Sequence, residues 1–281
     1  TMGCPAGIGP EIIVRLFDGA TSWRPDPGWP VAVVGDQAVL QRAARAISST
    51  MQCSEWRPGL PIIPGTIPVL QVESPESDSL HGLQWGQPTL ASGRAMARYI
   101  EKAVSLIQEG QGSALVTCPI SKYSLHQAGY QYPGHTEMLA ALTKTPQVHM
   151  MMAGPRLKVV LVTIHEALKN IPVLLSQEAV CACIRQTSTT LMRDFACSSP
   201  RIAVAALNPH GGEQGMFGEE EGRIIQPAIE TVRSELPQAE ISGPWPPDTV
   251  FYQAAQGKYD AVIAMYHDQG LSPFKLLHVE D

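Results

Sequence analysis

The sequence predicts an α/β fold in three layers, because short apolar runs alternate with segments of helical character along the chain. The apolar runs contain no interleaved polar residues, a pattern typical of strands buried on both faces of a parallel sheet. Strands and helices that alternate in this way pack as a sheet covered by helices on both faces. The runs occupy residues 31–34, 114–117, 159–162, 202–206 and 261–264, and the helical segments residues 10–17, 92–109, 176–195 and 219–236.

The helical segments are recognised from their first turns and from their apolar spacing. A proline and Glu11 open the segment at residues 10–17, and both favour the first turn of a helix. Within residues 92–109, apolar side chains such as Ile100 and Ile107 recur at helical spacing and predict one buried face. The two later segments show the same periodicity.

Length and composition limit the class of protein. The 281 residues are enough for about two domains at roughly 150 residues each, and 44% hydrophobic residues argue against disorder. A net charge of -6 without a basic block argues against a nucleic-acid partner. No apolar run reaches the roughly 18 residues of a membrane span, and no signal peptide is visible. Six cysteines in a chain of this length indicate reduced thiols in a cytoplasmic protein rather than a disulfide framework.

Histidines follow three of the apolar runs directly, at His165, His210 and His267. In open α/β sheets, ligands bind beyond the carboxyl ends of the strands. Three imidazoles there can hold a divalent metal and leave one coordination position open for catalysis. The alternative is that each histidine caps or hydrogen-bonds its own strand-end loop. His135, in a Gly-His-Thr-Glu loop, is a fourth candidate.

Two carboxylates and one lysine are further candidates. Asp268 follows a strand-end histidine and Asp248 lies in a proline-rich turn, so either could act as a base, although turns and helix caps also favour aspartate. Lys275 is a candidate anion contact, whereas isolated lysines are usually solvated. The glycine-rich residues 3–11 enter a helix, and helix N-termini bind anions. Neither a P-loop nor a G-x-G-x-x-G motif occurs, so the cofactor-binding residues stay unknown.

Taken together, five segments resemble the 4-hydroxythreonine-4-phosphate dehydrogenase family of pyridoxine (vitamin B6) biosynthesis. They occur in the family's order, and the resemblance covers the whole chain. The segments are TMGCPAGIGPE at residues 1–11, GHTE at 134–137, LNPHGGE at 207–213, GPWPPDT at 243–249 and AMYHDQG at 264–270.

The resemblance implies two α/β/α three-layer domains with a cleft between them, like isocitrate and isopropylmalate dehydrogenases and unlike a Rossmann fold. We expect a first domain over residues 1–115, completed by a C-terminal segment beyond this sequence. The second domain is expected over residues 116–281, with most of the metal site. A homodimer with the active site at its interface is also implied.

The implied chemistry is oxidation of 4-phosphohydroxy-L-threonine with NAD or NADP and a divalent metal, either zinc, magnesium or cobalt. The ketone formed can then decarboxylate. Carried over residue by residue, the metal ligands are His165, His210 and His267, the substrate-binding residues are His135, Thr136 and Lys275, and the acidic catalytic candidates are Asp248 and Asp268.

The chain departs from the family at Cys4, where the family has aspartate. The family also continues past Asp281 with an asparagine and an arginine that contact the substrate.

Three other functions stay open. The first is a dehydrogenase for phosphorylated threonate or erythronate. The others are a non-catalytic metal- or phosphate-binding homologue and a metal-dependent hydrolase.

Overall fold

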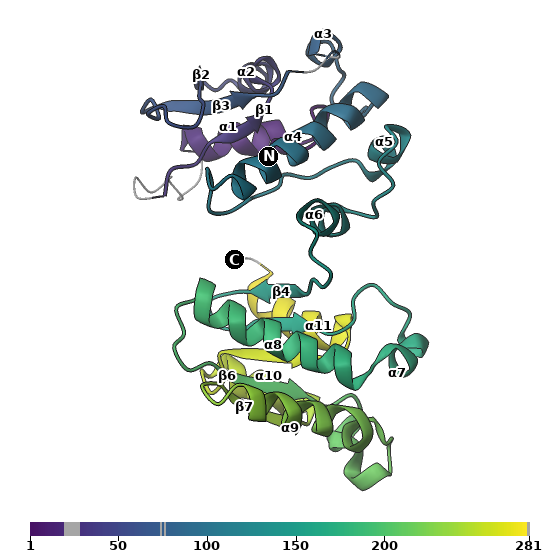
Figure 1. The fold of residues 1–281 in the computed structure, drawn as a ribbon. Helices are drawn as coiled ribbons and strands as arrows, with labels where there is room; N and C mark the ends of the chain where they lie inside the picture. The colour runs from purple at the N-terminus through teal and green to yellow at the C-terminus, as the bar shows by residue number, and fades with distance from the viewer. Residues whose placement is uncertain (20–28, 74, 76, 280–281) are drawn as a thin grey trace. The chain divides into compact units, whose positions relative to one another are not determined.

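The chain folds into two compact units in a computed structural model that describes residues 1–19, 29–73, 75 and 77–279 (Figure 1). The units are Thr1–Pro146 and Gln147–Asp281. Each has a mainly parallel sheet with helices packed on it, so the α/β fold predicted from the sequence is confirmed. In the part of the chain that is described, no helix is both long and apolar enough to cross a bilayer.

The first unit is built on a three-stranded parallel sheet in the order β1-β3-β2. Its core joins strand side chains such as Ile67 and Val69 to Leu40, Met96 and Ile100 of the helices. The strands are β1 (Val33–Gly35), β2 (Gln52–Glu55) and β3 (Thr66–Gln71). The helices are α1 (Gly9–Asp18), α2 (Gln37–Ala46), α3 (Ser77–His81), α4 (Leu90–Gln108), α5 (Lys122–Gln127) and α6 (His135–Thr143).

The division between the units lies at Pro146, and not between residues 115 and 116 as the sequence suggested. Helices α5 and α6 both pack against α4, which ties them to the first unit. At Gly93 of α4 an added Cβ would clash with the backbone of α5, so the two helices approach closely because this residue is glycine.

The apolar run at residues 114–117 is not a strand, which corrects the sequence prediction. Its neighbourhood offers few backbone partners: the carbonyl of Val116 accepts from the amino group of Thr1 at 2.6 Å, and the amide of Cys118 donates to the carbonyl of Thr1 at 3.2 Å. The Val116 side chain is exposed rather than buried. An apolar composition alone therefore does not make a strand where no continuous ladder forms.

The second unit contains a five-stranded sheet in the order β4-β5-β8-β6-β7. All neighbouring strands are parallel except the edge pair β4–β5. The strands are β4 (Met150–Ala153), β5 (Lys158–Leu161), β6 (Arg201–Ala205), β7 (Glu240–Trp245) and β8 (Ala261–Ala264). The helices are α7 (Ile171–Leu174), α8 (Gln177–Asp194), α9 (Gln226–Glu235), α10 (Pro247–Ala255) and α11 (His267–His278), with short helical turns η1 (Leu168–Asn170), η2 (Pro209–Gly215) and η3 (Glu221–Ile225).

Both faces of this sheet are buried, as its unbroken apolar runs predicted. Val160, Ile202 and Ile263 belong to the core shared with α8 and α9. Their strand neighbours, such as Val159 and Val262, belong to the core shared with α10 and α11. Because successive side chains of a strand point to opposite faces, each central strand needs apolar residues at every position. The second unit thus has the three layers that the sequence predicted.

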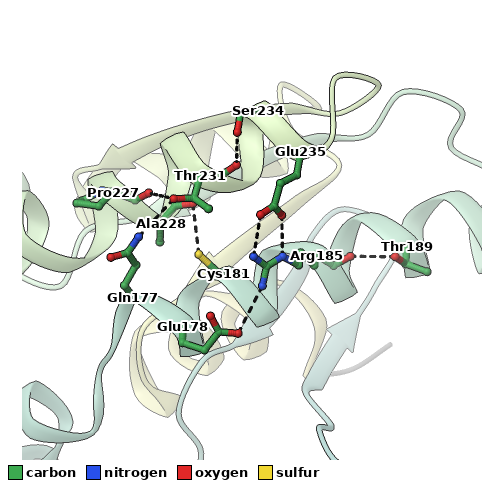
Figure 2. A network of polar contacts seen from close by, with 10 residues as sticks. All are labelled: Gln177, Glu178, Cys181, Arg185, Thr189, Pro227, Ala228, Thr231, Ser234 and Glu235. Atoms are coloured by element: carbon green, nitrogen blue, oxygen red, sulfur yellow. Dashed lines mark hydrogen bonds and ion pairs between the residues drawn. The ribbon is translucent and has the colours of Figure 1, made fainter.

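Polar contacts join α8 and α9, the two helices that share one core with this sheet (Figure 2). The Arg185 guanidinium donates to both carboxylate oxygens of Glu235, at 2.8 and 3.0 Å, and the Cys181 thiol donates to the carbonyl of Ala228 at 3.6 Å. The ion pair is at the surface, so it contributes little to stability beyond aligning the two helices. All six cysteines are free thiols, as predicted.

Candidate functional site

The three strand-end histidines lie beyond the carboxyl ends of adjacent parallel strands in the second unit. His165 follows β5, His267 follows β8 and begins α11, and His210 follows β6 within η2. Because β8 pairs in parallel with both β5 and β6, the three strands end at the same edge of the sheet. This is the edge at which open α/β sheets bind ligands.

His165 and His267 are brought together. Their ring centroids are 5.5 Å apart, with the ring planes inclined at 41°. His267 Nδ1 lies 2.7 Å from Asp268 Oδ1, a hydrogen bond that holds the ring and leaves Nε2 available. A carboxylate that binds one ring nitrogen orients the other for a metal. Neither ring nitrogen of His165 has a hydrogen-bond partner among the described residues.

His210 is not gathered with the other two. Its ring lies 5.9 Å from the ring of Phe217, its Nδ1 lies 3.7 Å from a carboxylate oxygen of Glu213, and its side chain is 69% exposed. Over the described residues, no three His, Cys, Asp or Glu side chains are assembled into a metal centre. The donor chemistry of the His165–His267 pair fits a divalent transition metal, and a third imidazole would complete a three-histidine site.

The backbone of η2 explains where His210 points. Successive residues from His210 to Gly215 have positive φ, between 43° and 94°. This left-handed region is strained for His210, Glu213 and Gln214 and is natural for the glycines between them. Strain of this kind persists only where the surrounding structure holds it, and it concentrates at functional sites.

A buried carboxylate holds the start of this turn. Glu221 Oε1 accepts hydrogen bonds from the amides of Leu207 and Asn208, at 2.8 and 2.7 Å, and Oε2 accepts from the Asn208 side chain at 3.1 Å. Glu221 is only 6% exposed. Glu221 could not be predicted from the sequence, because it is one of three consecutive glutamates, residues 219–221, and its partners lie in a different segment.

The carboxylates and the lysine are on two helices that begin at this edge. Asp248 lies in the first turn of α10, which packs against η2. Asp268 is 83% exposed and hydrogen-bonded to His267. Lys275 is exposed on α11. It follows Asp268 by two helical turns on the same face, about 10 Å along the helix axis.

His135 and Thr136 lie in the first unit, at the start of α6. The cap residue Gly134 offers no side-chain hydrogen bond, so the first amides of α6 depend on other partners. His135 Nε2 is buried and has no hydrogen-bond partner among the described residues. Burial lowers the pKa of His135, so this imidazole is neutral at pH 7 and can donate or accept a hydrogen bond.

Comparisons with known proteins give a consistent result. The sequence profile of the family described as "Pyridoxal phosphate biosynthetic protein PdxA" matches residues 29–281. A 4-hydroxythreonine-4-phosphate dehydrogenase of Desulfosudis oleivorans is 48% identical over 292 aligned positions, which cover all of this chain and 81% of the relative. A D-threonate 4-phosphate dehydrogenase of Salmonella typhimurium is 41% identical, covering all of this chain and 84% of the relative. The crystal structure of a 4-hydroxythreonine-4-phosphate dehydrogenase from Klebsiella pneumoniae superposes with a TM-score of 0.88 at 39% identity, over all of this chain and 82% of that one.

Proposed function

The chain belongs to the PdxA family of pyridoxal phosphate biosynthetic proteins, and from that premise we propose that it oxidises 4-phosphohydroxy-L-threonine with NAD or NADP. It is a dehydrogenase that acts on a CH–OH group. The proposed product is 2-amino-3-oxo-4-phosphooxybutanoate, a β-keto acid that decarboxylates to 3-amino-2-oxopropyl phosphate. The observation that carries this proposal is the pairing of His165 and His267 at the carboxyl edge of a parallel sheet.

We propose His165, His267 and His210 as the ligands of a divalent metal, which would be zinc, magnesium or cobalt. Neutral imidazole is a preferred zinc ligand, and the Asp268 carboxylate already orients His267 for that role. When bound, the metal supplies Lewis-acid stabilisation of charge that develops on the reacting oxygen, and the nicotinamide supplies the hydride acceptor. Within a single chain, His210 would reach this site only if η2 rearranged; the second chain of the proposed dimer is the other possible source of the third imidazole.

Asp248 is the better candidate for the base that accepts the hydroxyl proton. Asp268 is already hydrogen-bonded to His267, whereas no hydrogen bond to Asp248 is found within the described residues. Lys275 would hold the substrate phosphate, and His135 and Thr136 its polar end. Holding the substrate at two points orients the reacting carbon, which is a large part of enzymatic rate enhancement.

A second candidate is oxidation of D-threonate 4-phosphate or its erythronate isomer. The 41% identical relative from Salmonella typhimurium, which carries that name, favours this reading. Both substrates have a phosphate and a secondary hydroxyl, and they differ at the carbon that carries the amino or hydroxyl group.

We also propose a homodimer and a cytoplasmic location. The dimer follows from the family resemblance. The location is supported by six free thiols, since disulfides are rare in reducing compartments.

Initial rates of NAD and NADP reduction test the function, with 4-phosphohydroxy-L-threonine and D-threonate 4-phosphate assayed side by side. We expect the first substrate to have the higher kcat/KM, and chelation to abolish the rate until a divalent metal is restored. Preference for the threonate would establish the second candidate instead. A rate that survives complete chelation would remove the metal from the mechanism.

A further inference from the structure

The strand ends that carry the histidines are tied together by side-chain hydrogen bonds beyond the β-ladder. The last paired residues are Leu161 with Ala264 and Val204 with Ile263. Past these pairs, backbone hydrogen bonds still join β5 to β8, from the amides of Val162 and Thr163 to the carbonyls of Ala264 and Met265, at 2.9 and 3.2 Å. No such bond joins β8 to β6 among the described residues. The spacing of the His267 and His210 segments therefore depends on side-chain contacts.

Gln269 supplies the tie between β8 and β6. Its Oε1 accepts a hydrogen bond from the amide of Met265 at 2.7 Å, and its Nε2 donates to the carbonyl of Ala206 at 2.7 Å. Gln269 is 8% exposed, so both bonds are shielded from water. Met265 lies just before His267, and Ala206 just before the segment that carries His210.

Thr163 adds a side-chain bond to the backbone bonds between β5 and β8. Its Oγ1 donates to the carbonyl of Met265 at 2.7 Å, and its amide donates to the same carbonyl at 3.2 Å. Thr163 lies just before His165. Both ties meet at the backbone of Met265. Its carbonyl accepts from Thr163, which follows β5, and its amide donates to Gln269, whose side chain also bonds to Ala206 at the end of β6.

Helix α11 is itself pressed onto the sheet beside Gln269. A Cβ added to Gly270 would meet the side chains of Val159 and Leu161 at 2.5 and 2.9 Å. The glycine lets the helix sit directly on β5, so Gln269 has little freedom to move away from its two partners. The Gln269 side chain thus holds the ends of β8 and β6 at a fixed distance.

We propose that Gln269 is a positioning residue that sets the distance between the His267 and His210 segments, with Thr163 doing the same for His165. This inference rests on the proposed metal-binding function. An amide is required at position 269, since it offers one acceptor and one donor in the same group, whereas a carboxylate would face the Ala206 carbonyl oxygen with a second acceptor. A merely structural role would affect folding stability and leave metal binding unchanged.

The test compares Gln269→Glu and Thr163→Val with the matched control Thr187→Val. Thr187 is 1% exposed in α8, and its Oγ1 also donates to a backbone carbonyl at 2.7 Å, that of Cys183, away from the strand ends. Co²⁺ is titrated into chelator-treated, full-length protein, and the melting temperature of each variant is recorded. We expect Gln269→Glu to weaken Co²⁺ binding about 10–100-fold, as loss of an outer-shell partner does, and Thr163→Val to weaken it less. Thr187→Val should lower only the melting temperature.

Amide hydrogen exchange provides a readout that needs no metal. In the metal-free protein, Gln269→Glu should speed exchange at the amides of Leu207, Asn208 and His210, while Thr187→Val should not. Wild-type Co²⁺ affinity in both Gln269→Glu and Thr163→Val, or unchanged exchange at these amides, would overturn the inference. If the wild-type protein binds no Co²⁺, the proposed metal role fails, and the exchange rates still decide whether Gln269 positions this edge.

Discussion

The two sheets of this chain use the same structural position for different purposes. In the first unit, polar side chains at the carboxyl ends of β1 and β3 bind one another: Asp36 accepts from the amide of Val39 and from Gln71 Nε2, both at 2.9 Å, and Gln71 Oε1 accepts from the amide of Gln37 at 2.8 Å. In the second unit, His165 has no hydrogen-bond partner among the described residues and His267 keeps Nε2 available.

The difference teaches that a hollow at a sheet edge is not by itself a ligand site. Asp36, Gln37 and Gln71 line a cavity of about 510 Å³ in the first unit, but their polar atoms are already used to hold α2 on the sheet. Asp36 is 1% exposed and serves as the N-cap of α2. At the edge of the second unit, by contrast, polar bonds fix the backbone and leave imidazole nitrogens available.

The largest expected effect is the loss of either paired histidine. His165→Ala and His267→Ala should each weaken metal binding by more than the roughly 100-fold that loss of an outer-shell partner can cost, and should abolish NAD(P) reduction. Neither residue is buried in a core, so the melting temperature should stay close to that of the wild type. Metal content of the purified variants, measured with their melting curves, checks this. A variant that retains one metal per chain would remove that histidine from the site.

Asp36→Ala, at the sheet edge of the first unit, should lower the free energy of unfolding without weakening metal binding. It removes the N-cap of α2 and the acceptor of the exposed Gln71 side-chain amide, so the free energy of unfolding should fall by about 0.5–2 kcal/mol, mainly from the lost cap. Denaturant unfolding and a Co²⁺ titration of the same preparation measure the two quantities. Weaker Co²⁺ binding in the folded variant would show that the two edges are not independent.

Glu221→Gln tests how firmly η2 is held. A neutral amide would replace charge-assisted bonds to Leu207 and Asn208, so we expect a stability loss of about 1–2 kcal/mol and faster exchange at their amides. Glu230→Gln is the control, because Glu230 is exposed on α9 and, among the described residues, its only side-chain partner is Gln226. Equal behaviour of the two variants would mean that Glu221 does not anchor the turn.

The smallest expected effect is a dependence of stability on pH. Burial lowers the pKa of His149, and of His135, below the ordinary value of about 6.5. The unfolded chain therefore binds protons at these positions first, so stability is fully present above about pH 6.5 and is lost as the pH falls through the lowered folded-state values. Melting curves across this range should show the decline, and His149→Gln should flatten it.

The strands that could be predicted from the sequence are those whose burial shows in their own apolar pattern. β5, β6 and β8 were predicted because both faces of each strand are apolar. β7 was missed because Ser242, Gly243 and Pro244 interrupt its apolar pattern, and its role becomes clear only when it pairs with β6. The run at residues 114–117 shows the opposite error, an apolar segment without a ladder to join.

The candidate site was predictable in the same limited sense. The three histidines were found because each follows a buried run, whereas Gln269 and Thr163 were not, because their partners lie 63 and 102 residues away along the chain. A residue whose role is to hold another segment gives no local signal. The separation of His210 from the other two histidines likewise depends on the left-handed backbone of η2, which the sequence does not reveal.

The central claim is that the strand-end histidines of the second unit hold the metal, and X-ray absorption on wild-type protein loaded with one equivalent of Zn²⁺ tests it most directly. Zn–N distances of about 2.0–2.1 Å and Zn–S distances of about 2.3 Å are readily separated, and all six free thiols are competing ligands. The account predicts a first shell with three imidazole nitrogens, from His165, His267 and His210. A sulfur-containing shell, or one without imidazole, would contradict it.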